Sequence, residues 1–283
     1  MYVATVALSA CGGCEASLLA SGEPLISLLS EHSIAFSSAL VDRRTLSPSD
    51  IVLVSGCVRN SEDRRLLDEV SRTSRKIVAV GTCATYGGVC GLRELAVKAD
   101  ENEDLLPRVM PEAEPLDQSM SVELYVPGCP PPPRILFETL KALLEGVQPP
   151  RYQTTVCSDC SRRVRRAGPA AAMSPRSGGA SSDEACLLNE GMLCLGPVTR
   201  GGCEAACPTA GAVCAGCRGP SDAVLSSQLH SLYSDMVSYV ALTSGARRDK
   251  VAKQMEGMRD MIYLFTSRDP ATRFKVRGKV PRG

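Results

Sequence analysis

The chain has 283 residues, 44% of them hydrophobic, and a formal net charge of +1. This length and composition are enough for one domain with a sizeable core and a second, smaller domain. The balanced charge, the absence of tryptophan and the 4% aromatic content argue against nucleic-acid binding. No apolar run reaches the roughly 18 residues of a membrane span, and residues 1–8 carry no basic leader, so we expect a cytoplasmic protein.

The first half of the chain alternates short apolar runs with helical patterns. Strands are predicted at residues 2–9, 33–41, 50–54, 76–80 and 122–126. Helices are predicted at residues 15–32, 61–73, 92–98 and 133–145, the first interrupted by Gly22 and Pro24 and the second N-capped by Ser61. Residues 100–119 are predicted to be a loop. This alternation is typical of βαβ units, so we predict an α/β domain with a largely parallel sheet.

Cysteines follow the predicted strands of this domain at similar positions. Cys11 and Cys14 come after the first strand, and one cysteine comes after each of three others: Cys57, Cys83 and Cys129. Open parallel sheets bind ligands beyond the carboxyl ends of their strands. We therefore expect these cysteines to converge on one edge of the sheet.

The composition changes after Gln148, where Pro149-Pro150 marks a linker between a domain of residues 1–150 and one of residues 151–283. Residues 151–220 contain few long aliphatic side chains and cannot bury enough apolar area to fold alone. They also contain eight cysteines: Cys157, Cys160, Cys186, Cys194, Cys203, Cys207, Cys214 and Cys217. Metal clusters would have to organise this segment. Two helices, predicted at 223–244 and 249–267, complete a smaller irregular and helical domain.

Fourteen cysteines in a reducing cytoplasm indicate metal or redox chemistry rather than disulfides. Four thiolates hold one iron–sulphur cluster, and Cys-x-x-Cys spacing brings two sulphurs to the same cluster. The economical grouping is three sets: Cys11, Cys14, Cys83 and Cys129; Cys157, Cys160, Cys186 and Cys194; and Cys203, Cys207, Cys214 and Cys217. Interleaved pairing within the last eight remains open. The main alternative is a zinc-stabilised interaction protein with a four-thiolate ribbon of Cys157, Cys160, Cys214 and Cys217.

Other side chains have less specific interpretations. His32 and His230 are the only histidines, and each is expected at the surface or in the core rather than on a metal. The methionines at helical spacing are expected in the core or at a subunit interface: Met255, Met258 and Met261. The arginine run is expected to be a solvated face, with a docking surface for an acidic partner as the alternative: Arg162, Arg163, Arg165 and Arg166.

The cysteine motifs resemble those of a known family. Three of them are similar to motifs of the small subunit of [NiFe] hydrogenases: Cys11-Gly-Gly-Cys14-Glu15, Gly81-Thr-Cys83-Ala84-x-Tyr86-Gly87-Gly88 and Pro127-Gly-Cys129-Pro-Pro. The last two also resemble the quinone-reductase subunit of respiratory complex I. The later motifs resemble the cytoplasmic methyl-viologen-reducing (non-deazaflavin-reducing) hydrogenases of methanogenic archaea: Cys157-Ser-Asp-Cys160-Ser-Arg162, Gly191-Met-Leu-Cys194-Leu-Gly-Pro-Val-Thr199 and Cys214-Ala-Gly-Cys217-Arg-Gly-Pro220.

The resemblance implies a flavodoxin-like first domain and three [4Fe–4S] clusters, with the proximal cluster on the first domain. Hydrogen would be split at the nickel–iron centre of a separate large subunit, because this chain lacks that subunit's paired Cys-x-x-Cys motifs. Electrons would pass through the clusters to a small iron–sulphur adaptor subunit and a flavin-containing heterodisulfide reductase. The alternative is a complex I-like or formate-coupled electron-transfer module with another catalytic partner.

The chain departs from the family pattern at some of its cysteines. Many small subunits have a histidine where Cys157 stands and a three-iron medial cluster, whereas Cys157 and Cys207 complete four-thiolate sets here and predict two four-iron clusters. Cys57 and Cys90 are surplus; Cys57 is expected to be a buried thiol, with contact to the proximal site as the alternative. Glu15 is expected to be a carboxylate favoured at a helix N-terminus, with proton exit from the large subunit as the alternative.

Overall fold

The structure is a computed structural model that describes residues 1–43, 45–91, 109–165, 173–174, 184–226, 231–269 and 272. The chain divides into two compact units. The first is formed by Met1–Arg151 together with Phe265–Asp269, and the second by Tyr152–Leu264. The helix predicted at 92–98 and the side chains of His230 and Arg166 lie outside the described residues.

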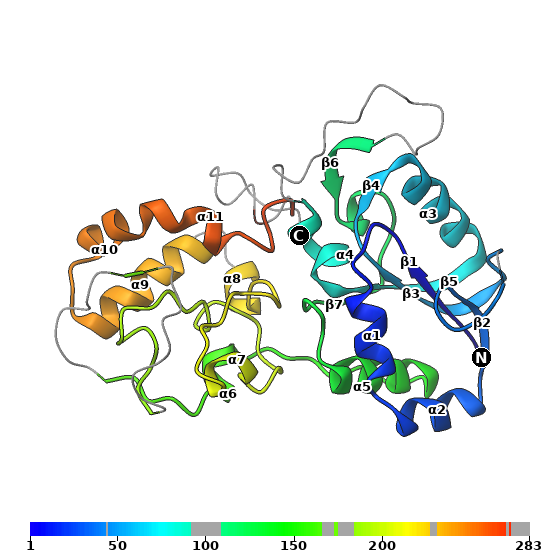
Figure 1. Cartoon of the computed structure of the whole chain (residues 1–283), viewed down its shortest axis with the longest axis horizontal. Coiled ribbons are helices and arrows are strands. Elements are labelled where there is room, and N and C mark those ends of the chain that lie inside the picture. Colours follow the sequence, from blue (N-terminus) through cyan, green and yellow to red (C-terminus); the bar gives the residue numbers. More distant parts are fainter. Residues whose placement is uncertain are drawn as a thin grey trace. The chain divides into compact units, whose positions relative to one another are not determined.

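A parallel sheet of five strands forms the centre of the first unit (Figure 1). In spatial order the strands are β2 (Ser33–Ser37), β1 (Tyr2–Ala7), β3 (Ser49–Ser55), β5 (Ser74–Val80) and β7 (Leu124–Val126). Every neighbouring pair is parallel. This is the strand order of flavodoxin-like doubly wound folds, so the α/β prediction is confirmed.

Helices cover both faces of this sheet (Figure 1). On one side lie α1 (Gly13–Leu19), α2 (Glu23–Ser30) and α5 (Pro133–Leu144), and on the other lies α3 (Ser61–Thr73). The helix predicted over 15–32 is two helices, because Gly22 takes a left-handed φ of +63° and Pro24 stands in the first turn of a new helix. Two short helices follow β5: α4 (Gly81–Tyr86) and the 3₁₀ turn η1 (Val89–Gly91).

Alternate residues of the strands face opposite helices, as the pleat requires. Val52 and Val54 of β3 are fully buried in the cluster that also holds Leu67 and Val70 of α3. Leu53 between them lines the other face of the sheet together with Leu18 of α1 and Leu136 of α5. The central strand is therefore buried on both sides, which explains its unbroken apolar run.

A second, two-stranded sheet corrects the prediction of a loop over 100–119. Within the described part of that stretch, β6 (Val109–Glu114) pairs antiparallel with β4 (Val58–Asn60), and the 3₁₀ turn η3 (Leu116–Gln118) follows. The proline and acidic residues of β6 interrupt the alternating apolar pattern by which a strand is predicted. Its pairing partner also lies about fifty residues earlier in the chain, and local sequence patterns do not reveal so distant a contact.

The second unit contains short helices joined by irregular segments. The helices are α6 (Val156–Asp159), α7 (Ala206–Thr209), α8 (Asp222–Ser226), α9 (Leu232–Ser244), α10 (Arg248–Met255), η4 (Glu256–Met258) and α11 (Arg259–Ile262). The two helices predicted at 223–244 and 249–267 are thus each broken into shorter elements. None of the described helices is long and apolar enough to cross a membrane.

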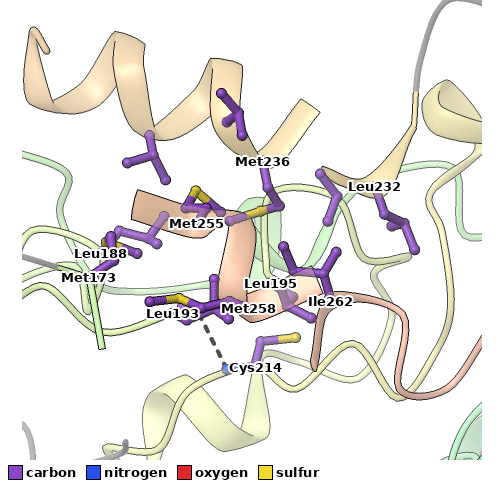
Figure 2. Close-up of a cluster of buried hydrophobic side chains, with 14 of the residues drawn as sticks. Met173, Leu188, Leu193, Leu195, Cys214, Leu232, Met236, Met255, Met258 and Ile262 are labelled. Atoms are coloured by element: carbon purple, nitrogen blue, oxygen red, sulfur yellow. Dashed lines mark hydrogen bonds between the residues drawn. The ribbon is translucent and has the colours of Figure 1, made fainter. Parts of the chain in front are cut away.

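The core of the second unit lies between its cysteine-rich segment and its C-terminal helices. Figure 2 shows Met236, Met255 and Met258 packed in one cluster with Leu193 and Leu195. The cysteine-rich segment therefore buries its few aliphatic side chains against α9–α11 rather than against itself. Met255 and Met258 are in the core as predicted, but Met261 is 42% exposed.

Candidate metal centres

The carboxyl ends of the parallel strands bring the first four candidate ligands to one edge of the sheet. Cys11 and Cys14 follow β1, and Cys14 lies in the first turn of α1. Cys83 lies in α4 after β5, and Cys129 follows β7. The Cys14 Sγ is 3.8 Å from the carbonyl oxygen of Val80, the last residue of β5. The predicted convergence on one sheet edge is confirmed.

Hydrogen bonds tie the three cysteine loops to one another. The Thr82 N–H donates to the Gly128 carbonyl, and the Gly128 N–H donates to the Thr82 hydroxyl, both at 2.9 Å. The buried Ser17 hydroxyl of α1 donates to the carbonyl oxygen of Pro131. The loops of Cys83 and Cys129 are therefore fixed to each other and to the helix that carries Cys14.

Two glycines leave space for cysteine sulphurs. A Cβ at Gly81, which has a φ of +85°, would stand 2.4 Å from the Cys14 Sγ. A Cβ at Gly88 would stand 2.6 Å from the Cys83 Sγ. Only glycine tolerates both the left-handed backbone and this approach of sulphur. The edge of the sheet is thus shaped around sulphur atoms.

The thiols at this edge lie close enough to repel one another when ionised. Burial, together with the charges of Glu15, Cys11 and Cys129, raises the pKa of Cys14 to about 12. Thiolates gathered in this way are unfavourable unless a cation offsets their charge. A bound metal would supply that cation and displace the thiol protons.

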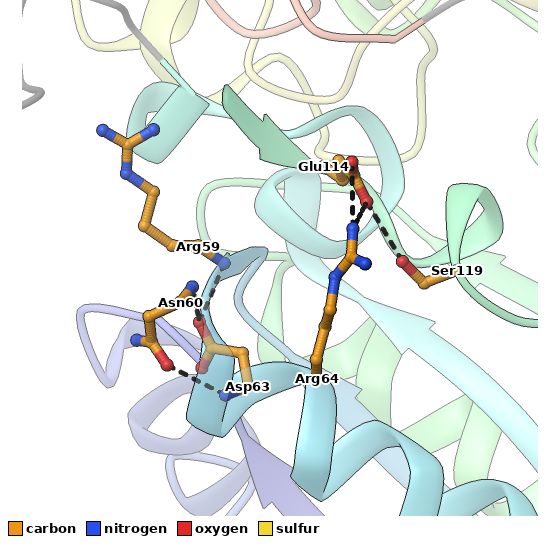
Figure 3. A network of polar contacts seen from close by, with 6 residues as sticks. All are labelled: Arg59, Asn60, Asp63, Arg64, Glu114 and Ser119. Atoms are coloured by element: carbon orange, nitrogen blue, oxygen red, sulfur yellow. Dashed lines mark hydrogen bonds and ion pairs between the residues drawn. The ribbon is translucent and has the colours of Figure 1, made fainter. Parts of the chain in front are cut away.

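The turn that carries Cys57 is fixed by the cap of α3 (Figure 3). The Asn60 side chain accepts hydrogen bonds from the N–H groups of Glu62 and Asp63, and Asp63 accepts from the Asn60 N–H. The N-cap is therefore Asn60 rather than the predicted Ser61, which is the first helical residue. Figure 3 also shows Arg64 of α3 reaching Glu114 of β6 at 3.3 Å, which joins the helix to the small sheet.

Cys57 and Cys90 adjoin the sheet edge although neither belongs to the predicted sets. Cys57 is fully buried, as expected, and its thiol lies 3.8 Å from the Ser9 carbonyl oxygen and hydrogen-bonds Cys90. The Cys90 Sγ is 3.7 Å from the Cys83 Sγ. The sequence alone assigned Cys90 no role. The adjacent glycines Gly87 and Gly88 could have indicated the turn that brings Cys90 back to Cys83.

Glu15 lines a mostly apolar pocket next to Cys14. It lies in the first turn of α1, the position that the helix dipole favours for a carboxylate. Its Oε1 accepts a hydrogen bond from the Ser55 hydroxyl, and its buried Oε2 has no hydrogen-bond partner in the described part of the chain. The pocket is also lined by Ser37 and Leu40.

In the second unit, backbone hydrogen bonds connect the segments that carry the eight remaining cysteines. The Cys186 N–H donates to the Arg163 carbonyl at 2.9 Å, and the Val156 N–H donates to the Thr199 carbonyl at 3.0 Å. The Leu195 N–H donates to the Cys214 carbonyl at 2.8 Å. Segments about twenty residues apart or more are therefore held side by side.

The four cysteines of the first set in this unit lie close enough for their charges to interact. Burial, together with the charges of Cys194, Cys186 and Cys160, raises the pKa of Cys157 to about 12. The Tyr239 hydroxyl of α9 hydrogen-bonds the Cys157 sulphur and favours its thiolate. The four cysteines that spacing groups together are thus also neighbours in the structure.

The second set adjoins the first, and two of its cysteines lie near a buried cation. The Cys214 N–H donates to the Cys194 Sγ at 3.3 Å, which links the two sets. Arg218 is 1% exposed, its Nε donates to the Gly201 carbonyl at 2.9 Å, and it lies within electrostatic reach of Cys203 and Cys217. Cys207 is exposed in α7.

The environment of Arg218 fits an anionic group. Burial lowers its pKa, while the charges of Cys203 and Cys217 oppose that effect. Its Nη1 is buried with no hydrogen-bond partner among the described residues. A buried and incompletely paired guanidinium is costly unless negative charge lies beside it, and a thiolate-bound iron–sulphur cluster supplies such charge.

The prediction of a solvated arginine run is wrong at its first residue. Arg162 is 7% exposed, and its guanidinium donates to the carbonyl oxygens of Pro208 at 2.7 Å and Ala185 at 3.1 Å. It joins the segments of the two cysteine sets. Arg163 and Arg165 are exposed as expected.

The side chains of the described residues form no group of three or more that is tight enough for a single metal ion. His32 is partly exposed and lies 3.4 Å from the N-terminal amine, away from the cysteines. A four-iron cluster distributes four thiolates over four different iron atoms, so it does not require such tight convergence.

Comparisons with known proteins find one family model over part of the chain and hydrogenase subunits over most of it. The family model of the NADH ubiquinone oxidoreductase 20 Kd subunit matches residues 11–143. The chain is 32% identical to the vhu G subunit of the F420-non-reducing hydrogenase of Methanococcus voltae, over 88% of this chain and 89% of that protein. It is 31% identical to the delta subunit of sulfhydrogenase 2 of Pyrococcus furiosus, over 78% of this chain and 87% of that protein. The recombinant [NiFeSe] hydrogenase of Desulfovibrio vulgaris Hildenborough shares the fold, with a TM-score of 0.51 and 19% identity over 78% of this chain and 94% of that chain.

Replacing Gly81 by alanine should empty the metal site at the sheet edge, because the new Cβ would displace the Cys14 sulphur. The control is Gly146→Ala: this glycine also has a positive φ, of +70°, but nothing lies within 4 Å of a Cβ there. Both variants carry a similar backbone cost, about 1–2 kcal/mol. We expect iron loss only in Gly81→Ala, measured as iron per chain after anaerobic purification. Equal iron content in the two variants would contradict the crowding argument.

Proposed function

The chain belongs to the family of the small subunits of F420-non-reducing hydrogenases, and on that premise we propose that it relays electrons between a hydrogen-splitting large subunit and an acceptor. It is the small subunit of a [NiFe] hydrogenase. The match of the complex I family model covers only residues 11–143, whereas the relatives that match most of the chain are hydrogenase subunits. The hydrogenase interpretation is therefore preferred to a complex I-like or formate-coupled module.

Three [4Fe–4S] clusters would be held by twelve cysteines. The proximal cluster takes Cys11, Cys14, Cys83 and Cys129. The other two take Cys157, Cys160, Cys186 and Cys194, and Cys203, Cys207, Cys214 and Cys217. When bound, each cluster supplies a site that accepts and releases one electron at a time. The chain has no catalytic centre of its own in this proposal.

The observation that carries the proposal is the grouping of thiols in two separate units. At the sheet edge, glycines at 81 and 88 make room for ligand sulphurs. In the second unit, repulsion among Cys157, Cys160, Cys186 and Cys194 and the buried charge of Arg218 both call for bound metal and sulphide. Each observation favours a cluster at a different point of a relay.

The partners follow from the relatives. The F420-non-reducing hydrogenase relative from Methanococcus voltae supports a pairing with a hydrogenase large subunit. We further propose that electrons leave this chain through a small iron–sulphur adaptor subunit to heterodisulfide reductase, and hence a role in methanogenesis in the cytoplasm. The Pyrococcus relative is a subunit of a sulfhydrogenase, so a sulphur-reducing partner is the alternative acceptor. Hydrogen-dependent reduction of a heterodisulfide by the purified complex tests this partner against a sulphur-reducing one.

The metal content of the purified complex tests the relay directly. Three clusters predict about 12 irons and about 12 sulphides per chain. Cys160→Ala and Cys207→Ala should each remove about 4 irons, because they belong to different sets, and the double variant should remove about 8. A colourless protein that contains only zinc would refute the proposal. Cys160→Ala alone removing about 8 irons would contradict the division into sets.

Removing the hydrogen bond from Tyr239 to Cys157 should lower the reduction potential of the cluster in that set. Hydrogen bonds to cluster sulphurs stabilise the more negative, reduced state. Tyr239→Phe keeps the ring and deletes the hydroxyl. Tyr233→Phe is the matched control on the same helix, because its hydroxyl donates to the Ala252 carbonyl at 2.7 Å instead. The readout is a redox titration followed by electron paramagnetic resonance; equal potentials in both variants and wild type would contradict the role of Tyr239.

A further inference from the structure

Cys83 and Cys90 form a pair of thiols at the edge of the sheet. The Cys83 thiol donates a hydrogen bond to the Cys90 sulphur, and the two sulphurs are 3.7 Å apart. A tetrahedral metal with bonds of about 2.3 Å to sulphur places two of its thiolates about 3.8 Å apart. The Cys90 sulphur therefore lies within bonding reach of a metal that Cys83 holds.

The position of Cys90 is held by contacts within the first unit. In η1 the Gly91 N–H donates to the carbonyl oxygens of Gly87 and Gly88 at 2.9 and 3.1 Å. The side chain of Arg268, 9% exposed, donates to the Gly91 carbonyl and pairs with Glu112 at 3.1 Å. A Cβ at Gly91 would lie 2.4 Å from the Arg268 Cγ, so the arginine packs directly on the turn.

These contacts make Cys90 a fixed neighbour of the cluster site rather than a thiol on a loose loop. The segment Phe265–Asp269 belongs to the first unit and supplies the arginine that packs on the turn. Cys90 also lies within electrostatic reach of Cys14, a second candidate ligand. Its sulphur therefore faces the same neighbourhood as the four presumed ligands.

We propose that Cys90 is an alternate ligand for the iron that Cys83 holds. In the exchange, the bond from iron to the Cys83 sulphur breaks and a bond from iron to the Cys90 sulphur forms. While Cys83 holds the iron, Cys90 is the thiol, and its proton passes to the released Cys83 sulphur 3.7 Å away. Iron keeps its oxidation state and its number of thiolates, so no oxidant or reductant takes part. This inference rests on the proposed function, since it requires a cluster at the sheet edge.

The first test replaces each member of the pair in the complete complex. Cys83→Ala should keep most of its proximal iron, because Cys90 takes over, whereas Cys83→Ala/Cys90→Ala should lose about 4 irons per chain. Cys129→Ala is the reference variant, because it shows how much iron per chain is lost when one presumed ligand is removed. If Cys83→Ala loses as much iron as the double variant, the inference is wrong. If the wild type itself holds no cluster at the sheet edge, the proposed function fails as well.

A second test does not depend on the folding of Cys83→Ala. A reserve ligand recaptures iron each time Cys83 releases it, so Cys90→Ala should lose its proximal cluster to an iron chelator several-fold faster than wild type. Cys57→Ala removes a buried thiol next to Cys90 but leaves the pair intact, and its rate should match wild type. The loss is followed by the proximal electron paramagnetic resonance signal. Equal rates for Cys90→Ala and wild type would overturn the proposal.

Discussion

The first unit depends on one constraint: all of its central strands run in the same direction. Because β1, β5 and β7 are parallel to β3 or to one another, their carboxyl ends meet at one edge. Loops more than a hundred residues apart in the sequence, such as those of Cys14 and Cys129, therefore become neighbours in space. The hydrogen bonds between Thr82 and Gly128 then fix the loops against each other.

The second unit reaches a similar result by different means. Its described cysteine segments are connected by isolated bridges such as that between Thr155 and Arg200, not by a continuous sheet. Its apolar core is shared with the terminal helices, whose Met236 and Met255 are fully buried. Thiols and the buried guanidinium of Arg218 occupy positions that apolar side chains would otherwise fill. Bonds between thiolates and metal would supply the stabilisation that this arrangement gives up.

The parts of the structure that the sequence predicts are those governed by local patterns. The strand ends and their cysteines follow from apolar runs, and the core positions of Met255 and Met258 follow from helical spacing. The parts that sequence patterns missed depend on distant partners. Arg162 looked like a surface residue, but its acceptors lie 23 and 46 residues away. β6 needed its partner β4, and Cys90 needed the turn that brings it to Cys83.

The N-cap of α3 shows that sequence patterns can misplace a helix boundary by one residue. Ser61 and Asn60 are both good caps by type. Asn60 is the cap because the Asp63 carboxylate accepts a hydrogen bond from the Asn60 N–H and another from the Ser9 hydroxyl at 2.7 Å. The cap thereby also fixes the turn after β1, next to the candidate ligands. Such reciprocal contacts decide between equivalent residues and are visible only in the folded chain.

Hydrogen-driven reduction of the assembled complex tests the relay most directly. With the large subunit bound and hydrogen as the only reductant, the visible absorbance of this chain's clusters should bleach, and reduced-cluster signals from both units should appear. The contradictory result is a large subunit that exchanges hydrogen isotopes while the absorbance of this chain does not change.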